Sequence, residues 1–268
     1  MKDTNSLSSV EHHWETRMGK MFPGERVVFR GKDLFHDLDN IRWMQLYLYG
    51  ITGRFFTEKQ EKLFEGIWII STSYPDPRIW NNRIASLAGT VRSTGTLGIC
   101  ASLSASDANI YGHGPAMKAM NFLVRARKKI KTENDLQEII KHELSKYKII
   151  YGYGRPILNR DERITPLYEL AKRLGLANGP YLDLAFNVEK YLKAGRWRMR
   201  MNVAALAAAL AADQGLLERE FYLFLTPSFI GGIIPCHIEA AEKKEGTFLP
   251  LRCGLINYQG KSKRKWAT

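Results

Sequence analysis

The chain has 268 residues, of which 45% are hydrophobic and 25% are charged. This composition excludes an intrinsically disordered chain and is enough for a substantial core in one or two domains. Forty lysine and arginine residues against 27 acidic residues give a formal net charge of +13. Such a balance favours anionic partners, namely nucleic acid, phosphorylated cofactors or polycarboxylates. A basic surface without any binding role is the alternative.

The cysteines and the apolar segments exclude several classes of protein. Cys100, Cys236 and Cys253 are far apart and form no CxxC pair, so we predict neither a zinc site nor a disulfide framework. Reduced thiols are typical of a cytoplasmic protein. The first residues lack a basic and then apolar signal pattern, and the alanine-rich run 203–212 is too short to span a bilayer. We therefore expect a cytoplasmic protein without a membrane segment or a metal.

In chain order, most of the sequence carries helical signals. One short strand is predicted at residues 24–31, where a β-branched pair lies between glycines. Amphipathic spacing and threonine caps predict helices elsewhere. These are residues 8–21, 33–49, a helix from Thr57, a small-residue stretch at 81–110, 116–131, 132–146, a helix from Thr165, 180–193 and 202–213. The predicted fold is all-α with few short strands.

The most informative stretch is KIIYGYGRPILNRDER at residues 148–163. Gly152 and Gly154 allow backbone conformations that other residues avoid, and a loop of this kind exposes N–H groups that suit an anion. Three arginines follow, and a guanidinium binds carboxylate or phosphate through two parallel hydrogen bonds. They are Arg155, Arg160 and Arg163. The stretch therefore indicates a loop that holds an anionic ligand, and a plain turn between two helices is the alternative.

Several further segments, in the same order, resemble the citrate synthase and citryl-CoA lyase family. GYGRP is similar to the family's G-[FY]-G-H loop, and RDER to the D-P-R that follows it. Six other segments carry the resemblance: PGERVVFRGKDLFHDL, YLYGITGRFFTEKQEKLF, NRIASLAGTVRSTG, MNVAALAAALAADQG, IPCHIEAAEK and LRCGLINYQG. The resemblance covers roughly residues 24–260, and the length is closer to the shorter citryl-CoA lyase-like members than to a full citrate synthase.

This resemblance implies an all-α homodimer in which each chain has a large and a small helical domain. Coenzyme A and a polycarboxylate bind between the two domains in the family, without a tightly bound cofactor. By this resemblance, residues 1–115 and 215–268 form the large domain, and residues 116–214 form the small domain. The CoA-binding loop of the small domain would consist of Gly152, Tyr153, Gly154 and Arg160.

The family's catalytic residues are only partly present. Members use two histidines and one aspartate, and the first histidine matches His113 in HGPA. An alternative alignment places Met117 there. The second histidine is replaced by Arg155, and the aspartate of N-V-D by Ala204. Alanine cannot accept a proton, and arginine does not deprotonate in proteins, so the sequence does not support enolisation of acetyl-CoA by the family's route. We expect Arg155 to hold a carboxylate or to stabilise an oxyanion.

Two other arginines match family positions that bind the substrate carboxylates, namely Arg163 and Arg252. Three hypotheses follow. In the first, the chain binds acyl-CoA and a polycarboxylate and is a transferase or lyase that forms or cleaves a C–C bond with altered catalytic residues. In the second, it is an inactive homologue, a pseudoenzyme that senses CoA or carboxylate or serves as a partner subunit. The third, a basic nucleic-acid-binding protein, lacks support from any helix-turn-helix, zinc-finger or RNP pattern.

Overall fold

The computed structural model describes residues 8, 11–13, 15–110, 112–155, 160–195, 198–248 and 250–261. The chain divides into two compact units. The first comprises Met1–Ser71 and Ala108–Ser228, and the second comprises Thr72–Asp107 and Phe229–Thr268. Both are built from helices, so the all-α prediction is confirmed. The division into large and small domains at residues 115 and 214 stays a prediction.

The first unit begins with a small antiparallel sheet whose strands are β1 (Gly19–Phe22), β2 (Arg26–Phe29) and β3 (Lys32–Asp33), in that order. The strand predicted at 24–31 is confirmed by β2. The helix predicted at 8–21 is wrong over most of its described residues. Residues 11–13 and 15–18 form turns, bends or irregular chain, and Gly19 to Phe22 pair with Phe29 to Arg26 as a hairpin. Residues 9, 10 and 14 of that prediction lie outside the described residues. Backbone pairing with a strand that contains two valines outweighs the weak helical pattern here.

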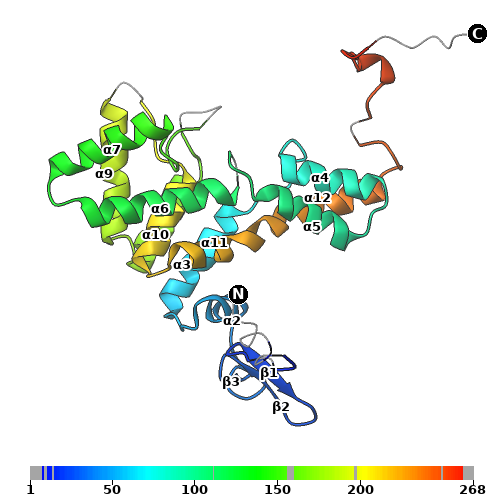
Figure 1. Cartoon of the computed structure of the whole chain (residues 1–268), viewed down its shortest axis with the longest axis horizontal. Coiled ribbons are helices and arrows are strands. Elements are labelled where there is room, and N and C mark those ends of the chain that lie inside the picture. Colours follow the sequence, from blue (N-terminus) through cyan, green and yellow to red (C-terminus); the bar gives the residue numbers. More distant parts are fainter. Residues whose placement is uncertain are drawn as a thin grey trace, which may run out of the picture. The chain divides into compact units, whose positions relative to one another are not determined.

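Most helices lie in the first unit (Figure 1). The helix predicted at 33–49 begins only at Trp43, because Asp33 accepts the backbone amides of Phe35 and His36 and so forms a turn. The helices are α2 (Trp43–Thr52), α3 (Glu58–Ser71), α6 (His113–Lys129), α7 (Glu133–Tyr147), α8 (Ile164–Leu174), α9 (Pro180–Ala194), α10 (Val203–Asp213) and α11 (Glu218–Leu225), followed by the 3-10 turn η1 (Thr226–Phe229).

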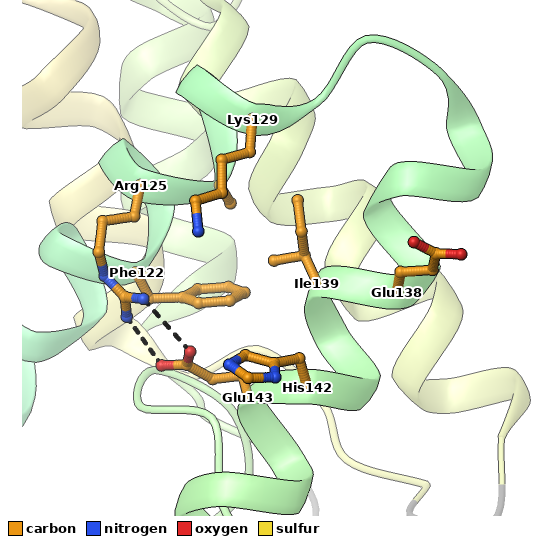
Figure 2. A pocket seen from close by; sticks show the side chains of 8 residues that line it. Phe122, Arg125, Lys129, Glu138, Ile139, His142 and Glu143 are labelled. Atoms are coloured by element: carbon orange, nitrogen blue, oxygen red, sulfur yellow. Dashed lines mark hydrogen bonds and ion pairs between the residues drawn. The ribbon is translucent and has the colours of Figure 1, made fainter.

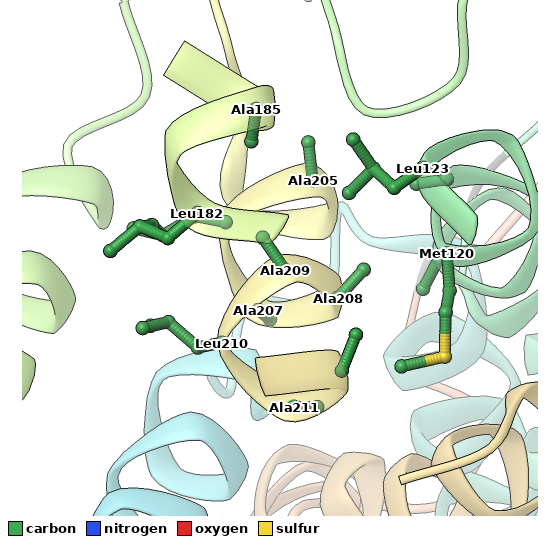
Figure 3. Close-up of a cluster of buried hydrophobic side chains, with 14 of the residues drawn as sticks. Met120, Leu123, Leu182, Ala185, Ala205, Ala207, Ala208, Ala209, Leu210 and Ala211 are labelled. Carbon is green, nitrogen blue, oxygen red and sulfur yellow. The ribbon is translucent and has the colours of Figure 1, made fainter. Parts of the chain in front are cut away.

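Helix α10 is the centre of this unit. Val203 and all residues from Ala205 to Ala212 are buried, and the helix packs against α3, α6, α8 and α9. Figure 3 shows its alanines between Leu182 of α9 and Leu123 of α6. Small side chains allow this close packing on several sides, because they let neighbouring backbones approach. The N-terminus of α10 is therefore fixed in place.

The second unit contains α4 (Trp80–Thr90), α5 (Gly95–Ser106), α12 (Ile230–Glu242) and the 3-10 turn η2 (Cys253–Leu255). Helix α4 packs against both α5 and α12. Glycines permit the contact, since a Cβ on Gly89 would lie 2.4 Å from the carbonyl oxygen of His237. The predicted small-residue stretch at 81–110 thus forms two packed helices, α4 and α5.

One stretch of the described chain, Glu218–Glu242, is long and apolar enough to cross a membrane by length and composition alone. Several of its apolar side chains are buried within their own unit. Phe221 and Phe224 are fully buried in the first unit, and Ile233 and Cys236 are buried in the second. Helices that form the core of a folded protein have this composition too.

Candidate functional site

The glycine loop is fixed to the segment that leads into α10. The amide of Gly154 donates to the carbonyl of Arg200 at 2.7 Å, and the carbonyl of Gly152 accepts the amide of Asn202 at 2.9 Å. The Asn202 side chain also donates to the carbonyl of Gly154 at 2.9 Å, while Tyr153 and Met201 pair as an isolated antiparallel bridge. The loop therefore has a defined conformation beside the N-terminus of a buried helix, as a ligand-binding loop requires.

The two glycines of the loop have different roles. Gly152 has φ +91°, and a Cβ there would lie 2.5 Å from the Cβ of Ala205 and 3.0 Å from its amide nitrogen. Gly154 has φ +85°, but its nearest neighbour would be the sulfur of Met199 at 3.5 Å. Only glycine permits both the conformation and the approach to α10 at position 152. Position 154 needs glycine for its conformation alone.

The side chain of Tyr153, between the glycines, points into the core. It is 5% exposed, and its hydroxyl donates to the carbonyl of Ala185 at 2.9 Å. Burial, with a smaller effect from the charge of Glu189, raises the pKa of this phenol well above its usual value. Tyr153 is thus a neutral anchor, and any contact that it makes with a ligand would come from its backbone.

Asp161 connects the loop region to α10. Its side chain is fully buried and accepts hydrogen bonds from Nε and Nη2 of Arg163 at 2.8 and 2.9 Å. The same carboxylate accepts the amide of Val203, the first residue of α10, at 2.9 Å. Burial acts to raise the pKa of Asp161, but the hydrogen bonds from Arg163 and Val203 and the charge of Arg163 outweigh it, so the pKa is lowered. Asp161 is therefore ionised at neutral pH.

The other two predicted arginines of this stretch lie at the same place. Arg155 forms an ion pair with Glu162 at 2.6 Å, donates to the carbonyl of Arg160 at 3.2 Å, and lies 3.9 Å from Asp161. The Arg160 guanidinium donates to the hydroxyl of Thr165 at 3.3 Å. The structure thus brings Arg155, Arg160 and Arg163 together around two acidic residues of the chain itself.

Ala204 occupies the second position of α10, directly after the residue that Asp161 caps. Its amide donates to the side chain of Asn202 at 3.0 Å, so the first turn of α10 is capped by groups of the chain itself. The methyl group of Ala204, which the sequence resemblance matches to the family's aspartate, offers no proton acceptor. The nearby Asp161 does not replace that aspartate as a base, because its oxygens are already bonded to Arg163 and Val203.

The remaining predicted residues, His113 and Arg252, belong to other elements. His113 is the first residue of α6, is 2% exposed, and packs edge to face against Tyr222 of α11 with ring centres 6.0 Å apart. Arg252 belongs to the second unit, just before η2, where its side chain is exposed. The loop glycines and the three arginines Arg155, Arg160 and Arg163 thus belong to the first unit, whereas Arg252 belongs to the second.

A pocket of about 300 Å³ between α6 and α7 is lined by none of the predicted residues. Figure 2 shows the ion pair of Arg125 and Glu143 next to the ring of Phe122, with Lys129 and His142 also at the pocket. Among the residues that the structure describes, no three histidine, cysteine or acidic side chains are grouped as a metal site would need.

Asp161 is the residue of the candidate site that sequence reasoning missed. The sequence places it two residues before an arginine, and that spacing allows a bidentate ion pair. The signal was not specific, because an aspartate and an arginine with the same spacing also occur at Asp76 and Arg78. That pair is exposed, with the arginine side chain 88% accessible.

The fold and the loop together define a helical protein of the citrate synthase class. The family described as citrate synthase, C-terminal domain, matches residues 25–244, so the chain belongs to the citrate synthase family. A comparison with the curated proteins gives no significant match.

Solved structures support the same fold. The chain is 20% identical to citryl-CoA lyase from Hydrogenobacter thermophilus, with a TM-score of 0.82 over 95% of this chain and 97% of that one. ATP citrate lyase from Methanothrix soehngenii, solved with citrate and coenzyme A, is 18% identical with a TM-score of 0.73 over 98% of this chain. Citrate synthase from Thermoplasma acidophilum, solved with carboxymethyl coenzyme A and oxaloacetate, is 18% identical with a TM-score of 0.66 over 85% of this chain. The chain spans 45% of the ATP citrate lyase chain and 59% of that citrate synthase chain.

Proposed function

We propose that this protein binds an acyl-CoA thioester and a polycarboxylic acid at the glycine loop, and that it forms or cleaves a C–C bond in such a thioester. The observation that carries the proposal is the loop itself, which is fixed on the N-terminus of α10 beside three arginines. Family membership and similarity to proteins solved with coenzyme A and citrate or oxaloacetate support it.

The proposed roles follow from the chemistry of each side chain. Arg155, Arg163 and Arg252 would hold the carboxylates, since a guanidinium is always charged and presents paired donors. Gly152, Gly154 and Arg160 would contact coenzyme A. The guanidinium groups of Arg155, Arg160 and Arg163 each bond to an oxygen of the chain itself. A ligand therefore has to share or displace those contacts.

Cleavage of a citryl-CoA-like thioester needs one proton removed from the hydroxyl group and one delivered to the acetyl carbon. His113 would exchange the proton, because the ring nitrogens of imidazole can both accept and donate one. Arg155 would stabilise the oxyanion that develops. Ala204 provides no base, so the proposal excludes enolisation by an aspartate at this position.

A second candidate function is binding without catalysis, in which the protein senses CoA or carboxylate or serves as a partner subunit. The methyl group of Ala204 at the start of α10 is the observation that favours it. In both cases we expect the cytoplasmic homodimer that is typical of the family.

Calorimetric titration of the purified protein with coenzyme A, acetyl-CoA, oxaloacetate and citrate tests binding. We expect saturable binding of coenzyme A or its thioester, weakened about tenfold by Arg155→Ala. The matched control is Arg173→Ala, which removes an exposed arginine at the end of α8. If none of the four ligands binds, the proposal is wrong.

Spectrophotometric assay of citryl-CoA cleavage and of citrate formation then separates the two candidates. Turnover that depends on His113 supports the enzyme. Binding without turnover of either kind supports the sensor or partner subunit.

A further inference from the structure

A second polar cluster lies directly before the glycine loop, within the first unit. The ammonium group of Lys118, on α6, donates to the side-chain oxygen of Asn109 at 3.1 Å and to the hydroxyl oxygen of Tyr151 at 3.3 Å. It also lies 4.6 Å from the centre of the Tyr151 ring. Three separate segments thus converge on one cation: the residues before α6, α6 itself and the residue that precedes Gly152.

Within the described part of the chain, the cluster has hydrogen-bond donors that its contacts leave unused. Lys118 has three N–H groups and uses two of them, Tyr151 retains its own hydroxyl hydrogen, and Asn109 retains its amide hydrogens. The acceptor atoms, in contrast, are occupied by Lys118. No acidic side chain among the described residues forms an ion pair with Lys118, so the cluster carries one uncompensated positive charge. Its complement is a ligand with negatively charged oxygen acceptors.

A surface pair of the same residue types shows how the cluster differs. The ammonium of Lys146 lies 4.9 Å from the ring centre of Tyr147, but both residues are exposed and no hydrogen bond joins the ammonium to the phenol in the described structure. Lys118 and Tyr151 are both half-buried. Partial burial strengthens the interaction of a fixed cation with an anion.

The cluster is next to the candidate site through Tyr151. The carbonyl of Gly152 accepts the amide of Asn202, just before α10, so the backbone at residue 151 is fixed by the same contacts as the loop. Lys118 lies on α6, which begins at His113. The cluster is therefore joined to the glycine loop through Tyr151, the residue directly before Gly152.

We propose that Asn109, Lys118 and Tyr151 form an oxyanion subsite that binds a carboxylate or phosphate group of the ligand. The identity of that ligand rests on the proposed function, whereas the ability of the cluster to bind an oxyanion does not. Lys118 supplies the charge, and the Tyr151 hydroxyl and Asn109 amide direct the oxygen atoms.

Calorimetric titration of wild-type protein, Lys118→Met, Lys118→Arg and Tyr151→Phe with citrate, coenzyme A and inorganic phosphate tests the subsite. Lys146→Met is the matched control, because it removes an exposed lysine beside a tyrosine from the same unit. We expect Lys118→Met to weaken binding of at least one probe about tenfold or more, Lys118→Arg to retain part of the affinity, and the control to equal wild type. Thermal unfolding of each variant verifies that it folds.

The outcomes test the oxyanion subsite and the proposed function separately. Dependence on Lys118 for citrate alone assigns a carboxylate, and dependence for coenzyme A or phosphate assigns a phosphate group. If phosphate binding depends on Lys118 but neither coenzyme A nor citrate binds, the subsite stands and the proposed function is wrong. If coenzyme A or citrate binds, and every probe that binds the wild type binds equally well to Lys118→Met, the subsite is wrong and the proposed function stands. If no probe binds to the wild type, both are wrong.

Discussion

Asp161 and Val203 are 42 residues apart in the sequence, yet the Asp161 carboxylate accepts the backbone amide of Val203 at 2.9 Å. This bond fixes the end of the glycine-loop region to the first residue of α10. The same carboxylate holds Arg163 through two hydrogen bonds. One buried charge therefore organises the loop region, a candidate ligand-binding arginine and the N-terminus of the central helix.

Replacement of Asp161 by asparagine tests this role. We expect Asp161→Asn to lower the free energy of unfolding by about 3 kcal/mol, because it leaves Arg163 without its buried carboxylate. The matched control is Asp76→Asn, which breaks an ion pair of the same spacing in which Arg78 is exposed. Its effect in denaturant unfolding should be much smaller, since exposed ion pairs contribute little. Equal effects of the two substitutions would contradict the role of Asp161.

The pH dependence of stability provides a second test of Asp161. The pKa of Asp161 is lowered in the folded state. Its charge therefore contributes fully to the free energy of unfolding above the ordinary aspartate pKa of about 4, and this contribution is lost as the pH falls below that value. We expect wild type to lose more unfolding free energy than Asp161→Asn between pH 5 and pH 3. Urea unfolding at several pH values measures the difference. Parallel curves for the two proteins would show that Asp161 contributes nothing through its charge.

The two loop glycines give a prediction with an internal control. Gly152→Ala needs a positive φ and places its Cβ 2.5 Å from the Cβ of Ala205, whereas Gly154→Ala needs a positive φ but has no neighbour closer than 3.5 Å. We expect Gly154→Ala to cost about 1–2 kcal/mol and Gly152→Ala about 1–3 kcal/mol more. Chemical unfolding measures both. A smaller loss for Gly152→Ala than for Gly154→Ala would show that α10 does not constrain the loop.

The helical fold and the glycine loop could be predicted from the sequence, because helical spacing, caps and glycine pairs are local signals. Thr132, for example, forms the expected cap with Asp135. The predictions that were wrong concern segments whose structure depends on pairing with another segment. Gly19 to Phe22 form a strand only because β2 provides a partner, and no local pattern indicates that partner.

The candidate site was harder to predict, because burial decides what a charged residue does. Asp76 and Arg78 have the same spacing as Asp161 and Arg163, and the first pair includes the literal D-P-R of the family. In the structure the first pair is exposed and the second is centred on a fully buried carboxylate. Similarly, Lys118 and Tyr151 are 33 residues apart, and no motif connects them.

Glu162 is expected to compete with the ligand for Arg155. Its carboxylate pairs with Arg155 at 2.6 Å, and the hydrogen bond from Arg155 is the main reason why the pKa of Glu162 is lowered. If Arg155 binds a ligand carboxylate, Glu162→Gln should raise the affinity for citrate about two- to fivefold, since an exposed pair contributes up to about 1 kcal/mol. Calorimetry measures the affinity. The control is Glu169→Gln, which removes the same charge from α8, where Glu169 pairs with Lys172.

An equal gain in both variants would point to net charge rather than to competition at Arg155. A loss of affinity in Glu162→Gln alone would mean that Glu162 orients Arg155 for the ligand instead of occupying it. Either result would contradict the proposal that Glu162 competes with the ligand for Arg155.

The sharpest test of the match between this sequence and the family's catalytic positions is to restore the two residues that are missing by that match. Arg155→His returns the histidine of the glycine loop, and Ala204→Asp returns a carboxylate to the second position of α10. We expect the double variant to gain citrate-forming or citryl-CoA-cleaving activity over wild type, because general acid–base catalysis is typically worth about 10²–10⁴-fold. Each single variant should gain less, since the two groups act on the same reaction.

Coupled spectrophotometric assays with acetyl-CoA and oxaloacetate, and with citryl-CoA, measure this gain. The matched control is Ala204→Asn, which is similar in size to the aspartate but cannot accept the proton. Thermal unfolding is needed for each variant, because the start of α10 is tightly packed and Ala204 is partly buried there. A folded double variant that binds coenzyme A but shows no activity would contradict the assignment of Arg155 and Ala204 to the family's catalytic positions. Activity that equals that of the Ala204→Asn control would contradict the role of the carboxylate in particular.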